Sequence, residues 1–132
     1  MKCSGMAMRR LACITGVALL TTSTLALAKP SNKWRLEFDG RARTTGEVEL
    51  SVSQGSASPT VVVVAIAQGT GENAAARQTR DVLRATFGRS VYKVEVDDGE
   101  DVLIKAKRGT ADFDVVVVRN TVDGLKLDLE RE

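Results

Sequence analysis

Residues 60–88, TVVVVAIAQGTGENAAARQTRDVLRATFG, contain a change from strand periodicity to helix periodicity. Residues 60–67 form a continuous run rich in β-branched side chains, which predicts a strand and leaves open that both of its faces are buried. The glycine-rich segment 69–71 interrupts this run. Residues 73–87 then predict the one helix of the chain, and Gly88 is a suitable residue for its C-terminal stop.

The predicted helix is amphipathic. Thr70 is a candidate N-cap, and Glu72 stands where a negative charge favours the positive end of the helix dipole. Spacing at 3.6 residues predicts one buried face, made of Ala75, Thr79, Val82, Leu83 and Thr86. The opposite side and its borders carry Arg77, Arg80, Asp81 and Arg84. Arg77 and Asp81 are four residues apart, a spacing at which they can form an ion pair.

On both sides of this stretch, apolar and polar residues alternate with period two, which predicts six further strands with one buried face each. The predicted strands are residues 34–38, 48–52, 92–96, 102–106, 113–118 and 125–130. Asp98-Gly99 is a strong hairpin signal, and strands joined by short turns are expected to pair antiparallel. The order βββαββββ therefore predicts an α+β fold, an antiparallel sheet of about seven strands with one amphipathic helix packed on one face. Whether so wide a sheet curls or splits is left open.

Residues 1–28 have the pattern of a secretory signal peptide. Three basic residues open the segment, residues 11–20 are apolar and uncharged, and Ala26-Leu27-Ala28 places small residues where a signal peptidase cleaves. A membrane anchor fits less well, because such an anchor needs about 20 continuous apolar residues. We therefore predict a cleaved signal peptide and export to the periplasm or beyond.

The expected mature chain has a polar leader, residues 29–32, and a single α+β domain, residues 33–132. Both cysteines belong to the predicted signal peptide, so the mature chain holds neither Cys nor His. Three of the 19 basic residues also leave with it, so 16 basic residues face 17 acidic ones, a net charge of −1. This balance offers no electrostatic case for nucleic acid, and no transmembrane segment is expected after cleavage.

The residue types that remain favour a protein without catalytic activity. A serine or threonine nucleophile needs a base to accept its proton, and the usual base, histidine, is absent. We therefore expect no enzyme and no cofactor. A small hydrolase that works with paired carboxylates is the less favoured alternative.

Two groups of charged residues are candidate binding sites. Arg77, Arg80 and Arg84 have the spacing i, i+3 and i+7, so they form a basic stripe that can meet an anionic envelope component or an acidic protein. The alternative is the solvated back of an amphipathic helix. Four carboxylates surround Gly99 and could attract calcium, although a solvated turn is the favoured interpretation; they are Asp97, Asp98, Glu100 and Asp101.

The segment from residue 46 to residue 118 has a family resemblance. Its matching residues are Gly69-Thr70, Ala74-Ala75-Ala76, residues 91–96, Ile104-Lys105-Ala106, and Gly109 followed by Phe113 and Val115. They resemble a small strand-strand-helix-strand-strand module of phage tail and bacterial surface proteins. As a whole, the chain resembles short, uncharacterised exported proteins of Gram-negative bacteria. Both resemblances imply a structural or binding role without catalytic residues, and neither implies a particular ligand.

These observations predict an exported, non-enzymatic small binding or accessory protein of the bacterial periplasm, whose partner is a protein or an anionic envelope component. The alternative is an interaction subunit of an extracellular or envelope assembly that pairs through a sheet edge. An unpaired strand edge beside an apolar patch favours the assembly subunit. A deep acidic cleft favours the hydrolase.

Overall fold

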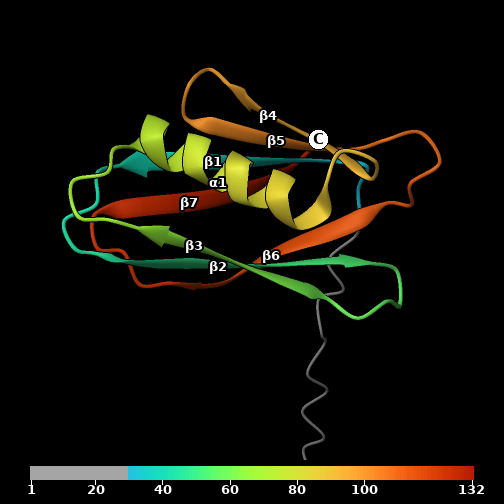
Figure 1. Ribbon diagram of the computed structural model, residues 1–132, viewed down its shortest axis with the longest axis horizontal. Coiled ribbons are helices and arrows are strands. Elements are labelled where there is room, and N and C mark those ends of the chain that lie inside the picture. The colour runs from blue at the N-terminus through green and yellow to red at the C-terminus, as the bar shows by residue number, and fades with distance from the viewer. Residues whose placement is uncertain (1–29) are drawn as a thin grey trace, which may run out of the picture.

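The computed structural model describes residues 30–132, and the predicted signal peptide lies outside these described residues. Within them the chain forms β1 (Lys33–Gly40), β2 (Gly46–Gln54), β3 (Thr60–Ile66), α1 (Glu72–Phe87), β4 (Tyr92–Asp97), β5 (Asp101–Ala106), β6 (Phe113–Asn120) and β7 (Leu125–Arg131) (Figure 1). The predicted α+β class and the order βββαββββ are confirmed. No helix in this part of the chain is long and apolar enough to cross a membrane.

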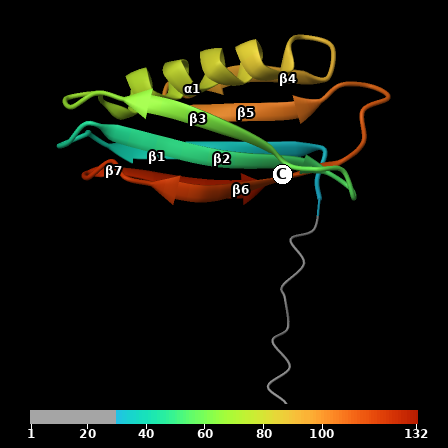
Figure 2. The same cartoon turned by 60° about the horizontal axis from the view of Figure 1, so that its bottom comes forward.

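The strands divide into two antiparallel sheets. One has four strands in the order β4-β5-β1-β7, and the other has three in the order β3-β2-β6. The sheets approach each other where β6 contacts β7, and α1 contacts strands of both sheets. Figure 2 shows β6 and β7 at the bottom of the molecule and α1 at the top. The helix and the inner faces of both sheets therefore enclose one core.

Successive strands pair less often than the short turns suggest. The expected antiparallel hairpins form between β2 and β3 and between β4 and β5, where the register closes with Asp97 opposite Asp101. The expectation is wrong for β1 and β2, for β5 and β6, and for β6 and β7, because each of these pairs is divided between the two sheets. Seven strands that would make one wide sheet are thus split, so that both sheets can bury a face.

At one end of the molecule, the chain crosses from one sheet to the other twice, after β1 and after β6. The backbone N–H of Arg41 donates to the carbonyl of Gly124 at 3.1 Å, and that of Arg43 donates to the carbonyl of Asp123 at 2.7 Å. Gly40 and Gly124 both have positive φ, at 94° and 82°. A β-carbon on Gly40 would overlap the carbonyl of Gly124. The two crossovers therefore run against each other at a distance that only glycine permits.

The helix buries its predicted face with two differences. Ala75, Thr79 and Leu83 are buried as predicted, and Ala76 joins them. Thr86 is exposed, so its predicted burial is wrong; its hydroxyl donates to the carbonyl of Val82 at 2.8 Å. The helix begins at Glu72 after Gly71 at the N-cap position, with no side-chain cap, so Thr70 does not act as the N-cap.

Aromatic side chains join the helix to both sheets. Trp34 of β1 is buried and its Nε1 donates to the carbonyl of Phe113 on β6 at 2.8 Å, which links one sheet to the other. The rings of Tyr92 and Phe113 have centroids 4.7 Å apart, and those of Tyr92 and Phe87 are 5.1 Å apart. This cluster closes the end of the core near the C-terminal end of α1.

Candidate functional site

The outer face of the three-stranded sheet carries an exposed apolar surface, which we call the valine face. Its members are between 45% and 54% exposed and are Val61, Val63, Val116 and Val118. Val61 and Val116 lie opposite Ser51, one on each side of it in neighbouring strands. Because serine is small, no large polar side chain stands between these two valines. Apolar side chains gathered in this way mark an interaction surface more often than isolated ones do.

An ion pair borders the valine face. Arg119 lies opposite Glu49 in the neighbouring strand, and its Nη2 lies 3.4 Å from the Oε2 of Glu49 and 3.9 Å from the Oε1 of Glu47. A register shift between Glu49 and Leu50 interrupts the ladder with β6 near Val118. Exposed pairs of this kind contribute at most about 1 kcal/mol, so this ion pair adds little to the stability of the fold.

The valine face ends at the edge strand β3, which packs beside α1 but lacks the charges, proline and bulge that commonly protect an edge against strand addition. Within the described residues β3 pairs only with β2, and its sequence TVVVVAI contains no charge, no proline and no bulge. By contrast, the edge strand β4 carries the charged residues Lys93 and Glu95. The Nε of Arg84 also donates a hydrogen bond to the carbonyl of Val94 at 2.9 Å. β6 and β7 contact each other. An edge strand without charges, proline or bulges can pair with a strand of another chain.

The outer face of the four-stranded sheet is organised around Arg35. Its guanidinium forms ion pairs with Asp101, with Glu132 at 2.5 Å and with Asp97 at 3.4 Å. The hydrogen bonds that the Arg35 guanidinium donates to Glu132 and Asp101 raise its pKa above the ordinary value. Hydrogen bonds from Lys33 and Arg35 in turn lower the pKa of Glu132. The centre of this face is therefore a network of ion pairs.

Two further carboxylates on this face have shifted pKa values of opposite sign. Glu95 lies 2.6 Å from the Nζ of Lys105 and 2.9 Å from that of Lys93, and these hydrogen bonds lower its pKa to about 2. The pKa of Glu37 is raised, chiefly by the negative charge of Asp101. One carboxylate is thus stabilised in its charged form and the other is held among like charges.

The predicted acidic turn does not gather its four carboxylates around one point. Asp101 is buried and pairs with Arg35, and Asp97 pairs with the same guanidinium. Asp98 adopts positive φ of 49° next to Gly99 at the tip of the hairpin. No group of three or more metal-ligating side chains occurs in residues 30–132. Asp101 therefore belongs to the ion-pair network of Arg35 and differs from the exposed side chain that the interpretation as a solvated turn implies.

The predicted basic stripe is divided among three different environments. Arg77 is exposed near the N-terminal end of α1, beside a hollow that Arg41 and Glu72 also line. Arg80 pairs with Asp81 at 2.9 Å and lowers the pKa of that carboxyl. Asp81 thus pairs with Arg80, and the possible pair between Arg77 and Asp81 does not form.

Arg84, the third member of the stripe, lies at the C-terminal end of the helix. There it lines a second hollow together with Arg89, Lys93 and Lys107. One residue of the predicted stripe therefore lies in a basic hollow, and the three other cations of this hollow come from outside the helix.

Sequence reasoning missed the valine face, although a signal for it was present. Residues 61–64 and 115–118 are two runs of four valines. In β3 the buried side chains are Val62, Val64 and Ile66, so burial on both faces is wrong and Val61 and Val63 are left exposed. A run of four valines in a strand with one buried face must expose two of them.

Compared with known proteins, the chain matches no family model, no curated protein and no solved structure. The resemblance to phage tail and bacterial surface modules therefore stays a prediction.

Proposed function

We propose that the protein is an exported, non-enzymatic binding or accessory protein that joins an envelope or extracellular assembly by strand addition at the free edge of β3. The observation that carries this proposal is the edge of β3, which pairs with no strand other than β2 in the described residues and carries no charge, next to the valine face. Among the interpretations of the sequence, this pairing of features favours the interaction subunit.

The chemistry of the edge indicates the kind of partner. Strand addition takes its affinity from main-chain hydrogen bonds and its specificity from alternate side chains. The outward positions next to the edge are Val61 and Val63, and the strand carries no charge. The partner is therefore an extended segment of another protein, uncharged over about six residues, whose outward side chains are β-branched or aromatic and extend the valine face.

The hydrolase alternative has less support. Paired carboxylates of a glycosidase need room between them for a sugar and an attacking group. Asp97 and Asp101 instead share the guanidinium of Arg35, with Asp101 buried.

Site-specific photo-crosslinking tests the proposal in the cells that produce the protein. The photoreactive amino acid p-benzoylphenylalanine replaces Val63 in one variant and Lys126 in a control. Lys126 is exposed and lies in β7, in the other sheet. We expect one discrete adduct from position 63 and none from position 126, because position 63 lies in the uncharged edge strand β3, whereas β7 carries charges and contacts β6.

A second substitution distinguishes strand addition from an accidental contact with position 63. Val61→Lys introduces a charge on the same exposed surface, where substitutions usually change stability by less than about 0.5 kcal/mol. The folded Val61→Lys protein should lose the adduct at position 63, since a charge at the edge opposes strand addition. Equal adducts from positions 63 and 126, or an adduct that persists with Lys at position 61, would contradict the proposal.

A further inference from the structure

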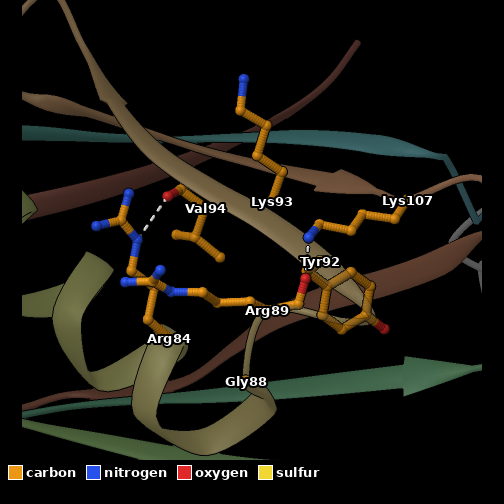
Figure 3. Close-up of a pocket in the computed structure, with 7 residues that line it drawn as sticks. All are labelled: Arg84, Gly88, Arg89, Tyr92, Lys93, Val94 and Lys107. Atoms are coloured by element: carbon orange, nitrogen blue, oxygen red, sulfur yellow. Dashed lines mark hydrogen bonds between the residues drawn. The ribbon is translucent and has the colours of Figure 1, made fainter.

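A basic hollow of about 300 Å³ lies at the C-terminal end of α1, far along the helix from Arg77. Seven residues line it: Arg84, Gly88, Arg89, Tyr92, Lys93, Val94 and Lys107 (Figure 3). The four cations come from the last turn of α1, from the loop that follows it, from β4 and from the residue after β5. Segments distant in sequence thus bring positive charge to one point.

Hydrogen bonds position two of these cations and leave donors free. The Nε of Arg84 donates to the carbonyl of Val94 at 2.9 Å, which holds the guanidinium at the wall of the hollow. Its terminal nitrogens have no hydrogen-bond partner in the described part of the chain, although the charge of Asp81, which is hydrogen-bonded to Arg80, acts on Arg84. Lys107 donates to the main-chain carbonyl of Arg89, and the guanidinium of Arg89 has no partner among residues 30–132. Figure 3 shows the side chain of Arg89 extending toward Arg84.

Nearby negative charge does not balance the hollow. Glu95 pairs with Lys93 at 2.9 Å, but it also pairs with Lys105 outside the hollow. The C-terminal end of a helix adds about half a negative charge, which one nearby cation complements. Stabilisation of the helix end therefore accounts for one basic residue, and it does not account for four.

We propose that this hollow binds a phosphomonoester group. A guanidinium offers parallel N–H donors that match two phosphate oxygens, and an ammonium adds a point charge. Arg84 and Arg89 supply two such forks and Lys107 supplies the ammonium, which suits a dianion with three terminal oxygens. A single carboxylate has one charge and two oxygens, and a dicarboxylate such as malonate divides its two charges between two separate groups, so neither presents three oxygens at one point to both forks and the ammonium. Val94 and Tyr92 also line the hollow but are 3% and 4% exposed, so the charged side chains make the contacts with the ligand.

Binding measurements with defined probes test this site on the purified protein. Inorganic phosphate is titrated calorimetrically at low salt, with malonate as the carboxylate probe. Vesicles that contain phosphatidic acid, a phosphomonoester lipid, are compared in co-sedimentation with vesicles of equal charge that contain phosphatidylglycerol, a phosphodiester. We expect tighter binding of phosphate than of malonate, or tighter binding of phosphatidic acid than of phosphatidylglycerol. The first result identifies a soluble phosphomonoester as the source, and the second identifies a lipid headgroup.

Matched arginine variants locate the binding. Arg89→Gln should weaken it roughly tenfold to a hundredfold, the usual effect of losing a charge-assisted hydrogen bond. Arg77→Gln, at the other end of the same helix, should change it less than twofold. Arg84→Lys keeps the charge but loses the fork, so it should weaken binding without unfolding the protein, as a thermal melt will verify. Absence of binding to phosphate and to phosphatidic acid, equal affinity for malonate, or equal losses from Arg77→Gln and Arg89→Gln would overturn the proposal.

Discussion

The two sheets bury their inner faces in the same core, but they differ in how far apolar side chains on their outer faces are exposed to solvent. On the four-stranded sheet, Leu103 points outward but is only 5% exposed, because it lies opposite Arg35 in one neighbouring strand and opposite Glu95 in the other. On the three-stranded sheet, Val61 points outward beside Ser51 and is 53% exposed. Long charged side chains cover an apolar neighbour with their methylene groups, whereas a serine cannot. The burial of an outward residue therefore depends on its cross-strand neighbours and on its place in the sheet, since Val63 lies opposite Glu49 but in the edge strand β3 and is still 45% exposed.

The largest expected effect comes from the core that both faces share. Phe113 is fully buried on β6, its carbonyl accepts the hydrogen bond from Trp34 of the other sheet, and its ring contacts Tyr92. Phe113→Ala should lower the free energy of unfolding by roughly 3–5 kcal/mol, measured by chemical denaturation. Because the core is common, amide exchange should accelerate in β1 and β2 together. A loss near zero, or a loss of protection in one sheet alone, would show that the sheets are separate folding units.

A pair of truncations tests the contrast between the two outer faces directly. Leu103→Ala should lower the free energy of unfolding by about 2–5 kcal/mol, because a buried leucine leaves a cavity. Val63→Ala, on the valine face, should change it by no more than about 0.5 kcal/mol in the isolated protein. Val63 is 45% exposed, so its truncation opens no enclosed cavity. Similar losses from both changes would mean that the valine face contributes to folding and is not a free surface.

The smallest expected effect is the acid response of the ion-paired face. The folded pKa of Glu95 lies at about 2, below its ordinary value of 4.5, so the unfolded chain binds more protons in this interval. Its stabilising effect is therefore complete above pH 4.5 and is lost as the pH falls toward 2. Glu95→Gln should be less stable than the natural protein at pH 7, and the difference should vanish near pH 2 in a series of thermal melts.

Glu37→Gln is the control of opposite sign for this acid response. The pKa of Glu37 is raised by like charges, so its charged form opposes folding above the raised pKa and this effect disappears as the carboxyl is protonated. The Gln variant should therefore be at least as stable as the natural protein at pH 7. A Glu37→Gln protein that loses stability in parallel with Glu95→Gln would show that both carboxylates serve in ion pairs.

Local pattern was sufficient for every element of the described chain. Period-two alternation predicted the strands, the Asp98-Gly99 turn predicted the β4–β5 hairpin, and 3.6-residue spacing predicted burial of Ala75, Thr79 and Leu83. These features depend on residues close together in the sequence, so the sequence contains them. The class and the order of elements follow from the same information.

Strand partners and binding surfaces depended on contacts between distant segments. The division into two sheets relies on the meeting of Gly40 with Gly124, and the basic hollow needs Arg84 near Lys107. Covering Leu103 likewise needs Arg35 from a strand nearly 70 residues away, in the register Arg35 opposite Leu103. Such pairings follow from which hydrophobic faces can be buried together, and one-dimensional periodicity does not encode them. Periodicity alone therefore determined which residues face inward, and only the tertiary structure decided which outward residues stay exposed and which cations share a site.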